Sequence, residues 1–368
     1  MNKKRICFII GVLSNTGGTE RVCTMIANAL CEKYDVTILS TWHGGNPSFH
    51  VDENVHIDYL MEPWEGKVYH FIPKYFDWKY RLYLQQKKFD VCIDVDICLA
   101  EHTVPALAET KTKIIEWEQF NYYHSANDAT LRASQSLAMR HCTGLVVLTK
   151  QDYDFYHVQG GVPESKLFKI YNASPFVGSH PSPRAEQLAI AVGRLTEQKG
   201  FDLLLQAWSR VERSGSDWRL AIIGSGKDEQ CLKTLAHELE LHNVTFVPAT
   251  SDIETWYDAS SIFLFSSRYE GFGMVLLEAM AKGLPAVSFD CIAGPRELID
   301  NDSTGFLVPI EDGGTKDVEH FAEKTIELLN SKEMQEKFSA NALQKSKKFG
   351  IESIKQQWIN MLDQVIAE

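Results

Sequence analysis

Two glutamates flank a glycine turn in the stretch RYEGFGMVLLEAMAKGLP, residues 268–285. Glu270 stands directly before the turn 271–273, and Glu278 lies among apolar residues of the run that follows. A carboxylate in apolar surroundings needs a hydrogen-bonding partner, either from the protein or from a ligand. The glycines allow close backbone approach, and amides at a helix start near Met274 can hold phosphate oxygens. The spacing therefore indicates a site in which Glu278 accepts hydrogen bonds from a ribose and Glu270 reaches a sugar.

A purely structural arrangement is the alternative for this stretch. In it, Glu270 caps the helix while Glu278 pairs with Arg268 or Lys282. Two carboxylates on either side of a glycine turn at a strand end favour the ligand site, because ligands of open α/β sheets bind at the carboxyl ends of strands.

Two further strand-to-helix loops carry residue types that suit an anion. Arg194 and Lys199 lie on VGRLTEQKGFD, residues 192–202, with no acidic neighbour able to neutralise both, which suits a diphosphate. Gly17 and Gly18 open a helix, whose first amides favour phosphate or carboxylate. Taken in isolation, each loop is explained equally well, or better, by a flexible turn or a solvated basic loop.

Alternating strands and helices position these loops. A continuous apolar run at 6–12 predicts a strand buried on both faces, followed by a helix with apolar residues at helical spacing. The alternation predicts two α/β halves, each with a parallel sheet covered by helices. The remaining strands are expected at 36–40, 55–60, 90–95, 113–117, 144–148, 167–171, 187–192, 219–223, 244–247, 262–265, 286–289 and 305–308.

Length, charge and cysteines narrow the class of protein. A chain of 368 residues suits two domains, and a formal charge of 37 minus 49, or −12, argues against nucleic acid as a partner. The eight cysteines form no Cys-x-x-Cys pair, which favours reduced thiols in a cytosolic chain over disulfides or zinc. The apolar N-terminal run is expected to be the first strand rather than a signal peptide, and no run is long enough to span a membrane.

Two other patterns are weak evidence for a site. Asp94-Val95-Asp96 looks like a metal motif but closes an apolar strand, and two carboxylates are few ligands for a cation. GSGKDE, residues 224–229, lacks the upstream glycine and the Ser or Thr of a phosphate-binding P-loop. We interpret it as another turn near the nucleotide.

In combination these residues resemble the retaining glycosyltransferases of family 4, which have the GT-B architecture. The resemblance covers nearly the whole chain and rests on GGTERV, LTKQDYDFY, KLFKIYNAS, AVGRLTEQKGFDLLLQAW, AIIGSG, YEGFGMVLLEAMAKGLPAVSFD, GPRELI and TGFLV. It implies two Rossmann-like domains facing a cleft. These are an acceptor-binding domain at 1–175, a linker at 176–186 and a nucleotide-sugar-binding domain at 187–345, with a helix at 346–368 that packs back on the first domain.

The resemblance also implies roles for individual residues. Arg194 and Lys199 match the pair that neutralises the diphosphate, Glu278 the ribose-binding carboxylate and Glu270 the carboxylate beside the donor sugar. No metal or cofactor is expected, because fixed cations and helix amides stabilise the leaving group. The other expected substrate contacts are Gly17 and Gly18 over the diphosphate, Gly224, Val247 and Pro248 at the base, and Gly271, Phe272, Gly273, Met274 and Val275 at sugar and phosphate.

One departure from the family pattern lies in IIEWEQFNYYHS, residues 114–125. Relatives commonly carry Glu-His where this chain has Glu118-Gln119. If this side chain contacts the donor sugar, Gln119 can still form hydrogen bonds, but it lacks the titratable imidazole of a histidine. His124 or His102 could take over that role, or it is not needed.

The acceptor side is expected near a basic and aromatic stretch. Residues 67–88 hold six basic residues, one acidic residue and seven aromatic residues, a composition that suits a membrane interface or else an ordinary surface helix with buried aromatics. The leading hypothesis is a cytoplasmic enzyme, at the inner face of the plasma membrane, that transfers a hexose or N-acetylhexosamine from a UDP-sugar to a glycan or lipid-linked saccharide. The alternatives are a sugar-nucleotide epimerase and a non-catalytic sugar-nucleotide-binding subunit.

Overall fold

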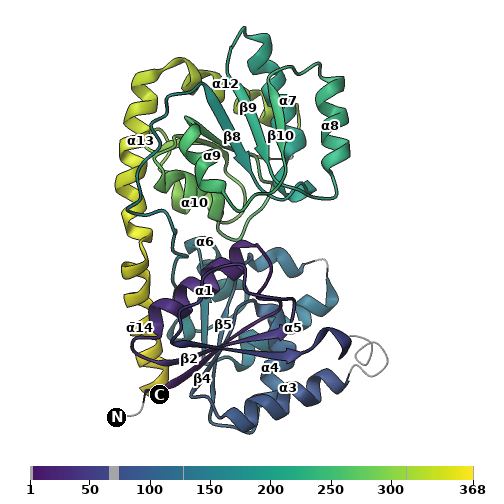
Figure 1. Ribbon diagram of the computed structural model, residues 1–368, viewed down its shortest axis with the longest axis vertical. Helices are drawn as coiled ribbons and strands as arrows, with labels where there is room; N and C mark the ends of the chain where they lie inside the picture. The colour runs from purple at the N-terminus through teal and green to yellow at the C-terminus, as the bar shows by residue number, and fades with distance from the viewer. Residues whose placement is uncertain (1–2, 66–73, 127, 312, 368) are drawn as a thin grey trace. The chain divides into compact units, whose positions relative to one another are not determined.

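The computed structural model describes residues 3–65, 74–126, 128–311 and 313–367, which form two compact units. Unit 1 comprises Met1–Ala173 together with Ile351–Glu368, and unit 2 comprises Ser174–Gly350. Each unit is built on one parallel sheet with packed helices (Figure 1). The prediction of two Rossmann-like α/β domains is confirmed.

Unit 1 has the strand order β3-β2-β1-β4-β5-β6-β7, with every pairing parallel. Its strands are β1 Arg5–Ile10, β2 Asp35–Trp42, β3 Val55–Met61, β4 Val91–Asp94, β5 Lys113–Trp117, β6 Gly144–Val147 and β7 Leu167–Lys169. Its helices are α1 Gly18–Leu30, α3 Lys74–Lys87, α4 Ala100–Leu107, α5 Ala129–His141, α6 Lys150–Asp154 and α14 Ile351–Ala367.

Both faces of this sheet are buried, as the continuous apolar run in β1 requires. Cys7 and Ile9 point into a core shared with Tyr80 of α3. Phe8, on the opposite face, contacts Trp358 of α14, with ring centroids 6.2 Å apart. The strand is therefore apolar at successive positions, because each side chain meets a different helical layer.

Unit 2 has the strand order β10-β9-β8-β11-β12-β13, again entirely parallel. Its strands are β8 Leu188–Val192, β9 Arg219–Ile223, β10 Val244–Val247, β11 Ile262–Phe265, β12 Ala286–Phe289 and β13 Gly305–Val308. Its helices are α7 Phe201–Arg213, α8 Glu229–Glu238, α9 Ile253–Ala259, α10 Met274–Ala281, α11 Pro295–Leu298, α12 Thr315–Asn330 and α13 Lys332–Ser346. The strand predictions from 219 onward are confirmed with the same bounds.

The segment expected to be a linker, 176–186, lies inside unit 2. Ser182 is buried there, and its hydroxyl donates to the backbone oxygen of Ser260 at 2.6 Å. Ser182 thus anchors this proline-rich segment to unit 2 through a backbone oxygen that lies between α9 and β11.

The C-terminal helix α14 is an integral part of unit 1, beginning at Ile351 rather than at 346 (Figure 1). The ring of Trp358 is fully buried and lies 4.7 Å from that of Trp117. At the surface, Lys33 pairs with Asp363 at 2.7 Å. Among the described residues, no helix is both long and apolar enough to span a bilayer.

Candidate functional site

The strand order of unit 2 reverses between two neighbouring strands, β8 and β11. In open parallel sheets, ligands bind at the carboxyl ends of strands beside such a switch point. The loop that leaves β8 carries Arg194 and Lys199, and the loop that leaves β11 carries Glu270. The fold of unit 2 thus brings two of the three predicted loops to one edge of one sheet.

Lys199 and Glu270 form an ion pair across these two loops. The ammonium of Lys199 lies 2.6 Å from Oε1 of Glu270, with the two side chains only 15% and 7% exposed. The ammonium also lies 5.9 Å from the ring centre of Phe265, at the end of β11. Low exposure strengthens this pairing relative to a surface pair.

Backbone contacts tie the two loops into one structure. The amide of Arg268 donates to the carbonyl of Gln198 at 2.8 Å, and the side chain of Gln198 donates to the carbonyl of Tyr269 at 3.1 Å. The hydroxyl of Ser266 donates to the carbonyl of Lys199 at 2.8 Å. Three hydrogen bonds therefore join the loop that carries Lys199 to the loop that carries Glu270.

Arg268 has a structural role in this junction. Its guanidinium makes two hydrogen bonds of 2.7 Å to the carboxylate of Asp202 at the start of α7. Burial opposes ionisation of Asp202, but the paired guanidinium outweighs it and lowers the pKa of that carboxyl. Arg268 is thus committed to Asp202 and does not pair with Glu278.

Lys282 is also engaged elsewhere, with ion pairs of 2.9 Å to Glu254 and 2.7 Å to Asp258 on α9. Glu278 is 5% exposed and accepts a hydrogen bond of 2.9 Å from the phenol of Tyr257. The structural alternative, in which Glu278 pairs with Arg268 or Lys282, is therefore not what the chain forms. Helix α10 has Gly273, not Glu270, at its N-cap position.

Backbone at the start of α10 adopts a conformation that requires glycine. Gly273 has φ 91°, and a Cβ there would lie 3.3 Å from the ring of Phe265. No side chain caps this helix. Its first backbone amides can therefore donate hydrogen bonds to an anion. Met274 and Val275 are half-buried in its first turn, and Phe272 is buried.

The predicted base-binding residues lie beside the same loop. A Cβ at Gly224 would stand 1.8 Å from the carbonyl oxygen of Gly193, just before Arg194, so only glycine fits there. The amide of Gly224 donates to the carbonyl of Val247 at 2.9 Å. Pro248 is exposed, and so is Arg194, whose side chain forms no ion pair with other described residues.

In unit 1, Gly17 is the N-cap residue of α1, and Gly18 is its first residue. The carboxylate of Glu20 folds back over this end, so that a Cβ at position 17 would lie 2.5 Å from its Oε2. The predicted flexible loop thus opens a helix, as expected, with a largely buried acidic side chain at its amino end.

Glu118 and Gln119 follow β5 of unit 1 and face different partners. Glu118 is 2% exposed and accepts hydrogen bonds from the phenol of Tyr156 at 2.5 Å and from the amide of Phe120 at 2.9 Å. The oxygen of Gln119 accepts from Asn172 at 3.1 Å, while its nitrogen is buried without a hydrogen-bond partner. The oxygens of both side chains are thus engaged, while both N–H donors of the Gln119 amide are unused.

Several buried carboxyl groups gather at the carboxyl ends of β4 and β5. Burial raises the pKa of Asp94 and that of Glu118 to about 8, and it raises the pKa of Glu116 and Asp96 as well. The described residues contain no group of three His, Cys, Asp or Glu side chains that could hold a metal ion. Of the two histidines considered for position 119, His124 lines a small cavity with Glu118, whereas His102 pairs with Asp77 of α3.

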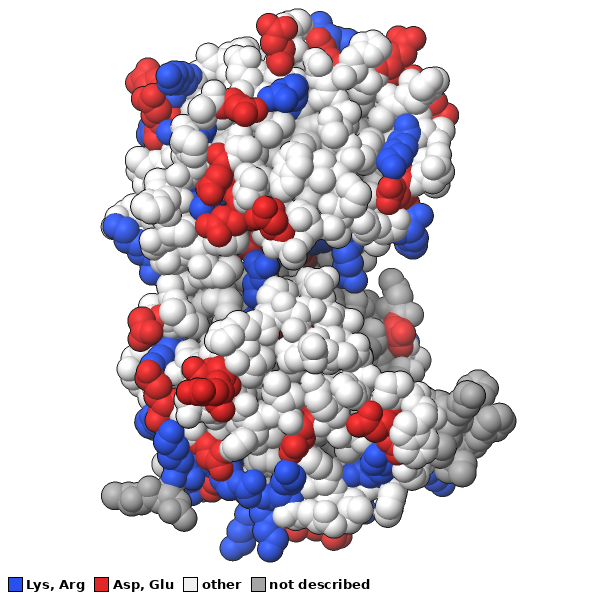
Figure 2. All heavy atoms as spheres, in the orientation of Figure 1, with Lys and Arg blue, Asp and Glu red and all other residues white. Residues whose placement is uncertain are grey.

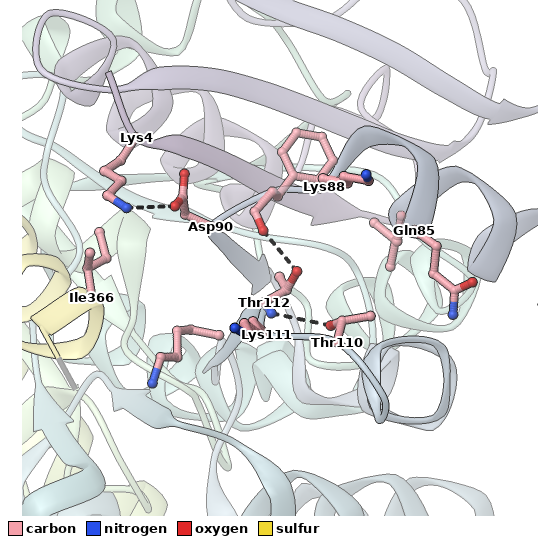
Figure 3. A pocket seen from close by; sticks show the side chains of 11 residues that line it. Lys4, Gln85, Lys88, Asp90, Thr110, Lys111, Thr112 and Ile366 are labelled. Carbon is pink, nitrogen blue, oxygen red and sulfur yellow. Dashed lines mark hydrogen bonds and ion pairs between the residues drawn. The ribbon is translucent and has the colours of Figure 1, made fainter. Parts of the chain in front are cut away.

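A larger cavity, of about 480 Å³, lies at the opposite edge of the same sheet, before β1, β4 and β5 (Figure 3). Lys4 points toward Asp90 there, at 2.8 Å. Lys88, Lys111 and Lys113 also line it, and Figure 2 shows Lys and Arg gathered at this end of unit 1. Because α/β sheets bind substrates at the other edge, we do not assign the reaction to this cavity.

Sequence reasoning missed the supporting partners of the site. These are Asp202, Tyr257, Tyr156, Asn172 and Glu20. Most of them lie far in sequence from the residue they contact, so no local pattern connects the two. The others are of a residue type that is common on protein surfaces and therefore gives no signal. Only the position of Asp202, two residues after Gly200 at a helix start, carried a local signal.

Relatives match nearly the full length of the chain. The family described as "Glycosyl transferases group 1" matches residues 176–345. An uncharacterized glycosyltransferase of Haemophilus influenzae is 33% identical over 366 residues, covering 98% of this chain and 100% of the relative. A Campylobacter jejuni protein named "GalNAc-alpha-(1->4)-GalNAc-alpha-(1->3)-diNAcBac-PP-undecaprenol alpha-1,4-N-acetyl-D-galactosaminyltransferase" is 26% identical over 367 residues, covering 98% and 99%.

Among solved structures, the pneumococcal O-GlcNAc transferase GtfA in complex with UDP and GlcNAc has a TM-score of 0.83 at 12% identity, covering all of both chains. At that identity the likeness concerns the fold alone. The full-length relative and the matching family carry the assignment: the chain belongs to the group 1 glycosyltransferases.

Proposed function

We propose that this chain is a retaining glycosyltransferase of family 4 that transfers a hexose or N-acetylhexosamine from a UDP-sugar to a glycan or lipid-linked saccharide. The observation that carries the proposal is the junction between the loops after β8 and β11. It places the ammonium of Lys199 and the carboxylate of Glu270 2.6 Å apart at the edge where α10 begins.

The chemistry at this junction suits departure of a nucleoside diphosphate. When the bond from the anomeric carbon to the diphosphate breaks, negative charge develops on the phosphate oxygens. Lys199, the exposed Arg194 and the amides of 271–274 supply fixed positive charge and hydrogen-bond donors for that charge. The acceptor hydroxyl attacks the same face of the sugar, and its proton passes to the leaving phosphate oxygen. In this scheme no metal ion takes part.

The remaining roles follow from the chemistry of each group. Glu278 accepts hydrogen bonds from the ribose, with Tyr257 fixing its carboxylate. Glu270 contacts the donor sugar when the diphosphate shares Lys199 with it. The other proposed contacts are Gly224, Val247 and Pro248 with the base, Phe272 and Val275 behind the amide turn, and Gly17, Gly18, Glu118 and Gln119 from unit 1.

The acceptor is proposed to be a saccharide precursor, met in the cytoplasm at the inner face of the plasma membrane. The Campylobacter jejuni relative carries an undecaprenol diphosphate-linked saccharide in its name, which supports a lipid-linked acceptor. The expected membrane contact at 67–88 is described only from residue 74 onward. There Phe76, Tyr80 and Leu84 are buried, whereas Trp78 is 57% exposed and Leu82 39% exposed, so one face of α3 is free for an interface.

Thermal unfolding in the presence of UDP-, GDP-, ADP- and dTDP-sugars tests the donor. UDP-sugars are expected to raise the midpoint, and a preference for another nucleotide would contradict the UDP assignment. Product anomer analysis by NMR tests retention, and full activity in EDTA is expected for a reaction without metal. Binding without turnover on any acceptor would instead favour a non-catalytic subunit, and conversion of the free sugar nucleotide an epimerase.

A further inference from the structure

The cavity of about 480 Å³ at the amino ends of β1, β4 and β5 lies apart from the residues of the proposed reaction (Figure 3). None of the residues proposed above to contact the donor lines it, and all of its walls belong to unit 1. Its volume falls within the roughly 300–1,000 Å³ of small-molecule sites. Leu84, Phe89 and Ile366 give it an apolar wall. The cavity therefore has room for a ligand of its own.

Positive charge predominates around this cavity. Four lysines and one aspartate line it, a formal charge of 4 minus 1, or +3, whereas the whole chain carries −12. No other acidic side chain of the described residues lines the cavity. Lysines gathered on one concave surface create a positive potential that attracts anions. A local excess of positive charge in an acidic chain therefore suits an anionic ligand.

The carboxylate of the cavity wall is already engaged on both of its oxygens. Oδ1 of Asp90 accepts from the ammonium of Lys4 at 2.8 Å, and Oδ2 accepts from the amide of Arg5 at 2.9 Å (Figure 3). Burial opposes ionisation of Asp90, but these two partners outweigh it and lower the pKa of that carboxyl. Asp90 thus neutralises Lys4 and leaves the charge of the other three lysines in place.

These three lysines have no carboxylate partner among the described residues. Within that part of the chain, the ammoniums of Lys88, Lys111 and Lys113 form neither an ion pair nor a hydrogen bond. The adjacent Lys87, which does not line the cavity, pairs with Asp58 at 2.7 Å. The cavity wall therefore carries three cations that a ligand can neutralise.

The other polar side chains of the wall donate within the protein. The amide of Gln85 donates to the carbonyl of Ala106 at 3.1 Å, and the hydroxyl of Thr112 donates to the carbonyl of Phe89 at 2.8 Å (Figure 3). The hydroxyl of Thr110 also donates to a backbone carbonyl. Most donors left for a ligand are thus the N–H groups of the three ammoniums, three on each. Compact ammonium charges of this kind suit phosphate oxygens.

Lys88 stands at a position where the backbone favours glycine. It directly follows α3 and has φ 55°, in the left-handed region that a residue with a Cβ adopts at a cost. Its amide donates to the carbonyl of Leu84 at 3.1 Å. Glycine is the usual residue just beyond a helix end of this kind. A change of Lys88 to glycine therefore removes the cation without straining the fold.

We propose that this cavity binds a phosphate-bearing compound with at least two negative charges, held by the ammoniums of Lys88, Lys111 and Lys113. The phosphate can belong to a soluble phosphate ester or to a lipid headgroup, because the ammoniums recognise the same group in both. The inference does not rest on the proposed function, in which the donor phosphates bind at the junction of Lys199 and Glu270 in unit 2.

Calorimetry of the full chain with inorganic pyrophosphate tests the site. Saturating UDP is present, so that pyrophosphate does not compete for the donor site. The variants are Lys88→Gly, which suits the left-handed backbone, and Lys111→Gln, which keeps a polar side chain. Lys337→Gln, at an exposed lysine of α13 in unit 2, is the matched control for the change of charge.

Pyrophosphate is expected to bind the unaltered chain. Lys88→Gly and Lys111→Gln should each weaken it by about tenfold, the scale of one hydrogen bond to a charged group, whereas Lys337→Gln should stay within about twofold. The thermal midpoint of Lys88→Gly should equal or exceed that of the unaltered chain, because glycine adopts the left-handed backbone more readily. A weaker affinity in that variant is then not a result of unfolding.

Sedimentation with vesicles of equal parts phosphatidylcholine and phosphatidic acid distinguishes the two sources of phosphate. Loss of pyrophosphate affinity in both cavity variants supports the site with a soluble ligand. Loss of sedimentation in both variants, in a chain that does not bind pyrophosphate, supports the site with a lipid headgroup. The site is overturned if neither probe binds, or if Lys88→Gly and Lys111→Gln bind both probes as well as Lys337→Gln does.

Discussion

The ammonium of Lys199 and the carboxylate of Glu270 lie 2.6 Å apart although the two residues are 71 positions apart in the chain. The contact joins the loop after β8 to the loop after β11, the two strands beside the switch point of unit 2. Without a ligand, the carboxylate partly neutralises the cation. A diphosphate that binds Lys199 must therefore compete with Glu270 or share the ammonium with it, which couples donor binding to the position of Glu270.

Replacing Lys199 with alanine should lower transfer by at least about 100-fold, because it removes a fixed cation from the developing phosphate charge. Thermal unfolding should also show a lower midpoint, because a largely buried carboxylate loses its cation. The double variant Lys199→Ala with Glu270→Gln should recover part of the midpoint without recovering activity. Activity near the unaltered level in the single variant would refute the diphosphate role.

Glu278→Ala should weaken UDP binding by about 10- to 100-fold, the range expected for hydrogen bonds to a charged group. The matched variant Tyr257→Phe keeps the carboxylate and removes only the phenol that donates to it at 2.9 Å. We expect a smaller loss, below about tenfold, for that variant. Calorimetry with UDP alone measures both, and unchanged affinity in Glu278→Ala would remove the ribose role.

The raised pKa of Glu118, about 8 in the folded chain, predicts a particular pH dependence of stability. Between its ordinary pKa near 4.3 and about 8, the unfolded chain loses this proton while the folded chain keeps it, so the group makes folding less favourable as pH rises. Glu118→Gln removes that dependence. Relative to the unaltered chain, its urea midpoint should therefore rise from pH 5 to pH 8.

The control for this measurement is Glu109→Gln, an exposed carboxyl of the same unit, whose midpoint should follow that of the unaltered chain. A constant difference between Glu118→Gln and the unaltered chain across the pH range would show that Glu118 is ionised in the folded protein.

Trp78→Ala should reduce sedimentation of the chain with vesicles of 70% phosphatidylcholine and 30% phosphatidylglycerol. The ring of Trp78 is 57% exposed on α3, beside basic residues that favour an anionic surface. Val158→Ala, at a residue 75% exposed elsewhere in unit 1, is the matched control for loss of apolar surface. Equal sedimentation of Trp78→Ala and the control would argue against an interface at α3.

Local patterns carried most of the fold and the loops of the site. Continuous apolar strands such as β1 and glycine turns such as the one before Met274 depend on residues close in sequence, so periodicity and glycine reveal them. Contacts over long separations were not accessible in this way. Nothing near Glu278 indicates Tyr257, and nothing near Gln119 indicates Asn172, because packing rather than local preference brings these residues together.

The alternative in which Glu278 pairs with a cation of its own stretch, residues 268–285, was wrong for the same reason. Arg268 and Lys282 are the cations nearest to Glu278 in sequence, yet each is paired with an acidic residue of another element. Local charge patterns suggest pairs only within a helix or loop. Asp202 lies at the start of α7, far from Arg268 in sequence. The two residues meet only because the sheet places the loops after β8 and β11 side by side.

The placement of α14 has a consequence for the order in which the chain can fold during synthesis. Trp358 fills the core of unit 1 between Phe8 and Trp117, so the residues up to Ala173 cannot complete that core until α14 has left the ribosome. Unit 2 is a continuous segment, Ser174–Gly350, and all of it emerges earlier. Unit 2 can therefore finish folding before unit 1, whose core stays incomplete until α14 has been synthesised.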